Sequence, residues 1–186
     1  MAPRVLKLGE LSDLEGAHLG FSSWHTVTQE QVDQFADATG DHQWIHLDPD
    51  RAKQGPFGTS VAHGFLTLSM LPVLLEEIVA VESTSSVVNY GLNRARFPAP
   101  VPVGSQLRVG VVLEGHEELQ GAHQLTFNCT FELAGSAKPP CVATIIFRYY
   151  VERPEVVAGV AGRAASSATN PAPAVARTTP ATGAKK

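Results

Sequence analysis

The residues best suited to acid–base chemistry lie together in one polar segment, residues 38–49. Asp41, His42, His46 and Asp48 all fall within it. A carboxylate and an imidazole that meet in a cleft can activate water, because the imidazole accepts a proton near neutral pH while the carboxylate orients its partner or accepts in turn. The spacing of Asp41 and His46 permits such a meeting without requiring it, since a helix-capping aspartate and a packed histidine would give the same pattern.

A second candidate lies at Ala62-His63-Gly64-Phe65, where a long apolar segment begins. The first backbone N–H groups of a helix have no acceptor within it, so they can bind an anion or a developing oxyanion. A glycine at position 64 would let a ligand approach its N–H closely. The same glycine is equally compatible with an ordinary turn, and a histidine beside a helix start is more often structural than a ligand.

A metal site is the alternative for these histidines. His42 and His46 are four residues apart, and Asp41 and His63 could complete a ligand set. That spacing brings two ligands together only on a helix, whereas the flanking glycine and proline predict a turn, and no glutamate stands between the histidines as in zinc peptidases. We therefore expect no metal. The sequence also has no Gly-x-Ser-x-Gly elbow and no phosphate-binding glycine loop, so it does not support a nucleophilic hydrolase.

Two helices should flank the polar segment and position its side chains. Thr28 and Gln31 fit a capping box at the start of a helix that we expect to end near Gly40. Asp48, followed by proline, fits the N-cap of a short helix that runs through Ala52. The candidate acid–base residues would then lie in the connection between the two helices.

The apolar segment from Gly64 to Val81 predicts one long helix. Pro72 and the pair Glu76 and Glu77 interrupt it, so we do not expect a transmembrane helix. A helix that is apolar on all sides is normally buried inside the protein. We expect this one to form the centre of the fold.

Four segments after this helix have the composition and alternation of β-strands. They are residues 86–92, 107–114, 124–133 and 142–151. Three prolines confine residues 98–104 to an extended connection or a sheet edge, and Gly121 predicts a turn between two long strands. A largely apolar helix followed by antiparallel strands indicates an α+β fold in which a sheet wraps around the helix.

The distribution of charge limits the ligands. The chain carries −4 overall, but residues 1–153 hold 10 Lys and Arg against 17 Asp and Glu, a balance of −7. This excess argues against a nucleic-acid partner and means that an anionic ligand must be met by local bases. Residues 154–186, rich in Ala, Pro, Thr, Ser and Gly, are predicted to form a disordered tail after a single domain over residues 1–153.

The cysteines and the N-terminal residues bear on the compartment. Cys129 and Cys141 each lie inside a predicted strand, which indicates free thiols in a reducing environment. The N-terminal residues contain no apolar stretch of signal-peptide length. We therefore expect a cytoplasmic protein with no membrane segment.

Four ordered blocks of sequence resemble one known family. They are Thr39-Gly-Asp-x-x-x-Ile-His46, then Asp48 and Ala52, then Ala62-His-Gly64, then Arg96-Phe-x-x-Pro-Val-x-x-Gly104. Over roughly residues 20–150 they resemble the MaoC-like dehydratases, and specifically the (R)-specific enoyl-CoA hydratases known as hydratase 2. The stretches FADATGDHQWIH and NYGLNRARFPAPVPVG are similar to the nodulation protein N-like branch of that family.

The resemblance implies a single hot-dog domain, in which an antiparallel sheet wraps a central helix. It also implies a homodimer joined edge to edge, with active sites near the interface. Asp41 and His46 would hold the water that adds to C3 of a trans-2-enoyl-CoA, and the N–H of Gly64 would polarise the thioester carbonyl. CoA is then the acyl carrier, and no metal or redox cofactor is implied.

Four further residues are expected to bind the substrate. Trp44 and Phe65 lie beside the candidate site in the sequence, although a tryptophan there could equally be a lid on the core. Arg94 and Arg96 are candidates for the CoA phosphates, and they should both project from the face of their strand opposite Phe97. Two solvated surface arginines would show the same pattern.

Two other functions share these features. A non-catalytic MaoC-like subunit that binds acyl chains or supports a partner would be expected to have lost one of the catalytic pair, and both residues are present. A hot-dog thioesterase would carry its carboxylate on the central helix, where Glu76 and Glu77 lie far from the helix start. Gln43-Trp44 stands where hydratase 2 proteins commonly have Asn-Pro, which leaves the acyl range open. The choice of carrier and the pathway are open as well.

Overall fold

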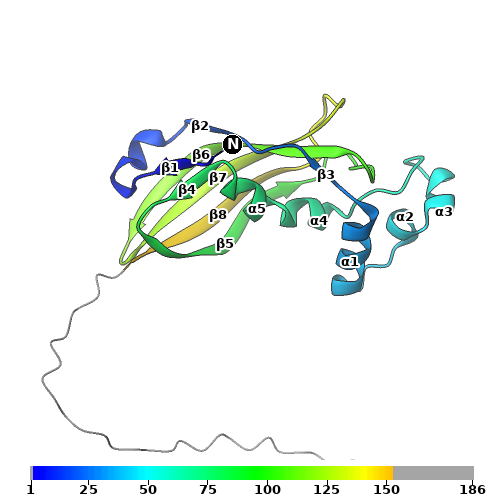
Figure 1. Cartoon of the computed structure of the whole chain (residues 1–186), viewed down its shortest axis with the longest axis horizontal. Coiled ribbons are helices and arrows are strands. Elements are labelled where there is room, and N and C mark those ends of the chain that lie inside the picture. The colour runs from blue at the N-terminus through cyan, green and yellow to red at the C-terminus, as the bar shows by residue number, and fades with distance from the viewer. Residues whose placement is uncertain (1, 153–186) are drawn as a thin grey trace, which may run out of the picture. The chain divides into compact units, whose positions relative to one another are not determined.

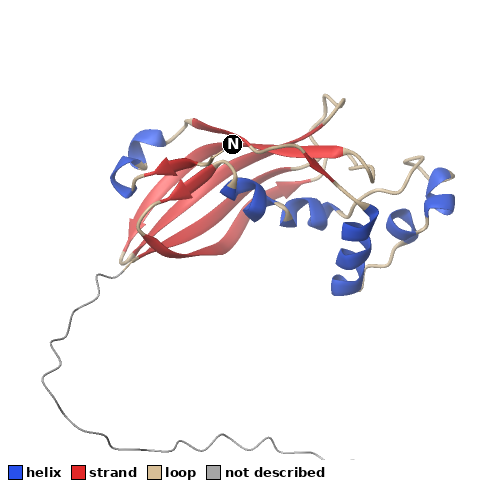
Figure 2. Ribbon diagram, viewed as in Figure 1, coloured by secondary structure: helices blue, strands red, loops and turns tan. Residues whose placement is uncertain are grey.

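The computed structural model describes residues 2–152 of the 186-residue chain, and its largest element is a curved antiparallel sheet around a helical segment (Figures 1 and 2). The strands are hydrogen-bonded in the order β2-β6-β7-β8-β5, and the short β3 also pairs with β6. They are β2 (His18–Phe21), β3 (His25–Thr26), β5 (Thr84–Arg96), β6 (Gln106–Leu119), β7 (Ala122–Leu133) and β8 (Val142–Val151). The predicted α+β fold is confirmed, whereas the predicted tail, residues 154–186, lies outside the described residues.

The four strands predicted from alternation are all present, and each is at least as long as expected. Leu125, Phe127, Cys129 and Phe131 of β7 are fully buried and alternate with residues on the opposite face. Because successive side chains of a strand point to opposite faces, this alternation decides which face packs on the core. The tight turn between β6 and β7 contains Gly121, whose φ of 77° costs glycine no steric strain.

The single helix expected after Gly64 is instead two short helices. They are α4 (Gly64–Ser69) and α5 (Leu71–Glu76), and they meet at Met70, whose φ of −73° and ψ of −17° keep the chain helical. Pro72 has no N–H to donate to the carbonyl four residues earlier, so the hydrogen-bond ladder is interrupted there.

The expected end of this helix, at Val81, is also wrong. The chain leaves the helix after Glu76 and forms β4 (Val79–Val81), which pairs in parallel with β1 (Arg4–Leu6). Val79 and Val81 are buried while the residue between them is exposed, a pattern that suits β-branched side chains in a strand. Two 3-10 turns follow β1, namely η1 (Leu8–Glu10) and η2 (Ser12–Leu14).

Three helices gather beyond one end of the sheet, near the start of α4 (Figure 1). They are α1 (Gln29–Thr39), α2 (Trp44–Leu47) and α3 (Pro49–Lys53). The predicted capping box is confirmed, because the Thr28 hydroxyl accepts from the Gln31 N–H while the Gln31 side chain accepts from the Thr28 N–H. Gly40 ends α1 with a φ of 78°, and the Asp48 side chain caps α3, both as expected.

The core lies between the inner face of the sheet and the α4–α5 segment. Its largest fully buried side chains include Phe127 and Phe131 from β7 and Leu71 and Leu74 from α5. Burying one such side chain contributes roughly 1.5–3 kcal/mol to folding.

Both cysteines are buried and free as predicted, and burial raises the pKa of each thiol to about 12. Within residues 2–152, no helix has the length and apolar character needed to span a membrane.

Candidate active site

The fold brings three titratable side chains together where α1, α2 and the start of α4 meet. Asp41 follows α1, His46 lies in α2, and His63 directly precedes α4. One carboxylate oxygen and one nitrogen from each imidazole all lie within 4.8 Å of one another. Asp41 is exposed, whereas His46 and His63 are buried. The pair expected from the sequence does meet, and a third residue joins it.

His46 is held so that one ring nitrogen remains available. Its Nδ1 lies 2.6 Å from the carbonyl oxygen of Val61, which can only accept, so Nδ1 carries the proton and Nε2 is unprotonated. The Gln29 side chain donates to the backbone carbonyl of His46 at 2.9 Å and anchors α2 to α1. Burial and the neighbouring His63 lower the pKa of His46 from its usual value, so the imidazole is neutral at pH 7 and can accept a proton.

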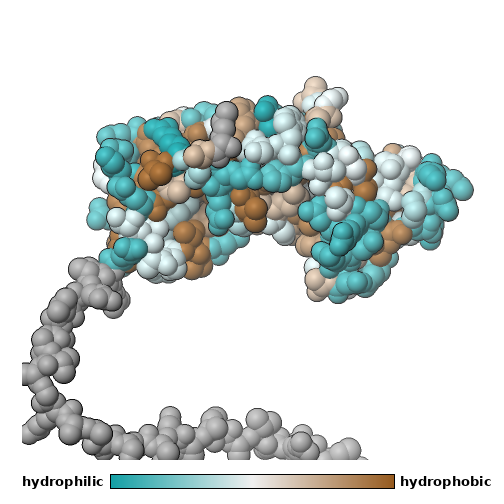
Figure 3. All heavy atoms as spheres, in the orientation of Figure 1, coloured by the Kyte–Doolittle hydropathy of each residue, from teal (hydrophilic) through white to brown (hydrophobic). Residues whose placement is uncertain are grey.

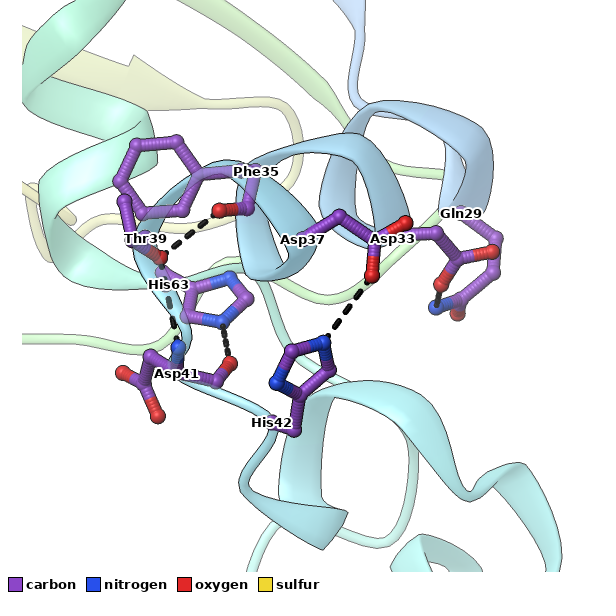
Figure 4. A network of polar contacts seen from close by, with 8 residues as sticks. All are labelled: Gln29, Asp33, Phe35, Asp37, Thr39, Asp41, His42 and His63. Atoms are coloured by element: carbon purple, nitrogen blue, oxygen red, sulfur yellow. Dashed lines mark hydrogen bonds and ion pairs between the residues drawn. The ribbon is translucent and has the colours of Figure 1, made fainter. Parts of the chain in front are cut away.

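The backbone of Asp41 is fixed on both sides (Figure 4). Its N–H donates to the Thr39 hydroxyl at 3.4 Å, and its carbonyl accepts from Nε2 of His63 at 2.9 Å. The Thr39 hydroxyl in turn donates to the carbonyl of Phe35 at 2.7 Å, one turn earlier in α1. Within residues 2–152 no hydrogen-bond donor is recorded for the Asp41 carboxylate, so both of its oxygens remain available to a ligand.

His42 does not take part in this cluster. Its ring lies 3.0 Å from the carboxylate of Asp37 at the surface, and this hydrogen bond raises its pKa (Figure 4). The spacing of His42 and His46 therefore does not form a metal site.

The cluster of Asp41, His46 and His63 is a second candidate for a metal site. Asp41, His46 and His63 offer an oxygen and two nitrogens, a set that zinc accepts. The two imidazoles, however, are stacked with centroids 3.7 Å apart and planes 25° apart. Their in-plane lone pairs therefore run nearly side by side instead of converging on one point, so the set does not fit a metal ion without rotation of the rings.

Two cavities share His46 and Gly64 in their walls. The larger, about 330 Å³, is otherwise mainly apolar, with Ile45, Phe57, Val61, Phe97, Pro98 and Pro100 among its lining residues. The smaller, about 190 Å³, is also lined by Phe35, Thr39, Asp41, His63 and Phe65. A molecule that touches both His46 and Gly64 would thus have an apolar space on one side and the carboxylate on the other.

Gly64 is required by packing as well as by its position. A Cβ at this residue would lie 3.0 Å from Cγ of Phe97, so any side chain would press on that ring. Gly64 is the first residue of α4, where a backbone N–H has no acceptor within the helix. Its N–H is therefore available at the wall that the two cavities share.

The expected substrate-binding residues fall into two groups. Phe65 lines the smaller cavity and lies beside Phe97, with ring centroids 5.9 Å apart. Trp44 instead packs against Gly55, under the guanidinium of Arg51 at 4.4 Å, and belongs to neither cavity wall.

Arg94 and Arg96 point away from the core, as the alternation predicted. They lie opposite Thr144 and Val142 of β8, and directly opposed residues of paired strands share a face. The buried Ala143 between those positions faces inward, so both arginines are on the outer face of the sheet. The structure does not bring them to the cluster around His46, and their contact with CoA remains a prediction.

Sequence reasoning did not find the supporting residues Thr39, Gln29 and Phe35, and it took His63 for a structural histidine or a metal ligand. Thr39 stands within the Thr-Gly-Asp motif, so its proximity to Asp41 was visible in the sequence. The contacts of His63 and Gln29 join residues 22 and 17 positions apart, and nothing local indicates them.

Comparisons with known proteins identify the family of this chain. Residues 11–129 match the family described as MaoC like domain. The 3-hydroxyacyl-thioester dehydratase Z of Mycobacterium tuberculosis is 54% identical over 143 residues, which cover 76% of this chain and 95% of that protein. Nodulation protein N of Rhizobium leguminosarum bv. viciae is 41% identical over 145 residues, which cover 76% of this chain and 89% of that protein.

A solved structure shares the fold of this chain. The MaoC-like dehydratase from Rhodospirillum rubrum superimposes with a TM-score of 0.65 at 19% sequence identity, covering 80% of this chain and 99% of that chain. The family match, the two curated relatives and the sheet wrapped around a helix lead to one conclusion: this chain belongs to the MaoC-like dehydratases and is a hot-dog lyase that removes or adds water.

Proposed function

We propose that the protein catalyses the (R)-specific hydration of trans-2-enoyl-CoA to (R)-3-hydroxyacyl-CoA and the reverse dehydration. The observation that carries the proposal is the convergence of the Asp41 carboxylate and the His46 imidazole beside two cavities that both include Gly64 in their walls. The hydrogen bond of Nδ1 to Val61 leaves Nε2 of His46 as the proton acceptor. A relative that is 54% identical is named a 3-hydroxyacyl-thioester dehydratase, which supports a thioester substrate.

In this reaction Asp41 and His46 hold one water molecule. Nε2 of His46 accepts a proton from the water as the oxygen forms its bond to C3 of the enoyl group. The electrons of the C2–C3 double bond move toward the thioester carbonyl, and the enolate oxygen is stabilised by the N–H of Gly64. A single donor aimed at such an oxyanion contributes roughly 3 kcal/mol. The proton taken from water is then delivered to C2, which completes the addition. Because the water is held on one face of the double bond, one configuration results at C3.

The cavities fit the two parts of an acyl thioester. The apolar walls of the larger cavity, about 330 Å³ beside His46 and Gly64, are suited to an acyl chain. The two side chains and one N–H supply all the chemistry that hydration requires, so we propose that the enzyme uses no metal or redox cofactor and that CoA enters as part of the substrate.

We propose that two copies pair through β5. This strand is an edge of the sheet, and its exposed side chains include Val87, Val88, Tyr90 and Leu92. Figure 3 shows hydrophobic side chains at the surface over β5 and α5, whereas hydrophilic ones cover α1. A long unpaired edge with apolar side chains is a template for pairing with another strand. Light scattering on the full chain tests this: a monomer at micromolar concentration would contradict it.

The thioesterase alternative has less support from the geometry. Glu77 is bound to His25 and to the N–H of Ser23, and Glu76 lies at the end of α5. Neither residue lines the cavities that contain His46 and Gly64. A non-catalytic acyl-binding subunit has no need of the Asp41–His46 arrangement.

We propose a cytoplasmic location, because both cysteines are free and a reducing compartment keeps them so.

A single set of assays on the purified full chain tests the function. We expect crotonyl-CoA to lose its enoyl-thioester absorbance without release of CoA, and the product to be oxidised by an (R)-specific but not by an (S)-specific 3-hydroxyacyl-CoA dehydrogenase. Release of CoA without hydration would indicate a thioesterase. Neither reaction, across short to long acyl chains, would indicate a non-catalytic subunit, and an (S) product would overturn the stereochemical assignment.

A further inference from the structure

His63 contacts both members of the catalytic pair. Its Nε2 donates to the backbone carbonyl of Asp41 at 2.9 Å, and its ring stacks on the imidazole of His46 with centroids 3.7 Å apart. Phe35 of α1 covers another side of the same ring at 5.1 Å. The side chain is 3% exposed, so its orientation is set by these contacts and not by solvent.

The hydrogen bond to Asp41 identifies which ring nitrogen of His63 is the donor. A carbonyl oxygen can only accept, so Nε2 carries the proton, and Nδ1 is left as an acceptor. Nδ1 is buried and has no partner within residues 2–152. The donor of the ring is therefore directed at the backbone of Asp41.

The hydrogen bond of His63 to Asp41 and its stacking on His46 both affect how the carboxylate and the imidazole are placed relative to each other. The Asp41 carboxylate follows its own backbone, which Thr39 fixes at the N–H and His63 fixes at the carbonyl. Rotation of the His46 ring about its Cβ–Cγ bond is limited by the hydrogen bond to Val61 and by the stacked ring of His63. A displacement of about 1 Å between reacting groups can reduce a rate by a factor of about 100.

We propose that His63 is a positioning residue that sets the carboxylate of Asp41 and Nε2 of His46 at the separation needed to share one water. This rests on the proposed hydratase function. His63 does not touch the reacting atoms; it acts through the other two residues. Its loss should therefore lower kcat and leave the KM for crotonyl-CoA nearly unchanged.

Two substitutions separate the two contacts. His63→Gln keeps an N–H donor that can reach the Asp41 carbonyl and removes the stacked ring. His63→Phe keeps a stacked ring and removes the donor. We expect each to lower kcat about tenfold with KM changed less than about twofold, since each removes roughly one net interaction of about 1.4 kcal/mol. The matched control makes the same substitutions at His42, which lies next to Asp41 but whose side chain hydrogen-bonds Asp37 at the surface, and should leave kcat within about twofold of the wild type.

A double-mutant cycle distinguishes positioning from general stability. In an Asp41→Asn background, His63→Gln should cause little further loss, because residues that act as one unit are not additive. A purely structural role would lower the folded fraction and give the same relative loss in both backgrounds. Wild-type kcat in both position-63 variants, additive losses in the cycle, or failure of both variants to fold would each overturn the proposal.

A readout without substrate separates this inference from the proposed function. A crystal structure of the His63→Phe protein should show the Asp41 carboxylate displaced from its wild-type position relative to the His46 ring. If the wild-type protein hydrates no enoyl-CoA but this displacement is seen, the function fails and the positioning role stands. If the enzyme is active and the pair keeps its wild-type geometry in the variant, the positioning role fails alone.

Discussion

The proposed catalytic residues Asp41 and His46 lie in opposite environments. The carboxylate is exposed and its backbone is fixed by hydrogen bonds, whereas the imidazole is buried and its Nδ1 is tied to a carbonyl. Desolvation disfavours the charged form of an imidazole, which keeps His46 ready to accept a proton. The carboxylate, which solvent can reach, can orient the water.

Removing either residue should abolish most of the activity. We expect Asp41→Asn and His46→Gln each to lower kcat about 100-fold or more with little change in KM, because both act on the same water. The double variant should be scarcely worse than either single variant. Steady-state kinetics with crotonyl-CoA measures this, and two small, additive losses would contradict the shared role.

The pH dependence should follow the protonation of His46. Burial is the largest cause that lowers its pKa below the usual 6.5, and the hydrogen bond to Val61 opposes it. Only the neutral ring accepts a proton, so kcat/KM should be constant near pH 7 and fall as the pH drops through a value below 6.5. The residual activity of His46→Gln should lack this acid limb. A limb centred above 6.5 in the wild type would contradict the assignment.

At the scale of elements, the end of β5 places arginines on the outer face of the sheet and leads into a residue that packs beside the candidate active site. Its end carries Arg94 and Arg96 on the outer face of the sheet, while Phe97, directly after it, packs against Gly64. The direction of these side chains was expected from period-two alternation alone.

If these arginines bind the CoA phosphates, Arg94→Ala and Arg96→Ala should raise KM several-fold for crotonyl-CoA and much less for crotonyl-pantetheine. The effect should shrink with salt, because exposed charges are screened over about 10 Å at about 0.1 M. Lys7→Ala, which removes a surface charge paired with Glu10, is the control. Equal changes with both substrates would show that the arginines serve the fold or an interface.

On the scale of the whole molecule, the proposed catalytic residues all lie within residues 2–152. The predicted tail, residues 154–186, has few large apolar side chains and an excess of bases, in contrast to the acidic part before it. Truncation after Arg153 should therefore leave the melting temperature and kcat unchanged. Thermal denaturation and kinetics of the truncated protein test this, and a lower melting temperature would mean that the tail docks on the domain.

Features decided by neighbours in the sequence were predicted correctly. The capping box of Thr28 and Gln31, the end of α1 at Gly40 and the strand alternation of β7 each depend on hydrogen bonds or side-chain directions within a few residues. The sequence motif also named Asp41 and His46, which the fold does bring together, while their catalytic role stays a prediction. The length of the helix after Gly64 was not predicted correctly, because residues 79–81 pair with β1, which lies more than 70 positions earlier in the chain.

The tertiary structure alone decided the contacts that complete the site. Residues 41, 46 and 63 could have met or remained apart, and the sequence left a catalytic pair and a packed histidine both open. Their meeting depends on where α1 and α2 lie against the start of α4, which is set by burial of apolar faces and not by any local pattern. Local interactions fix the elements, but the contact between Asp41 and His63 forms only when those elements pack together.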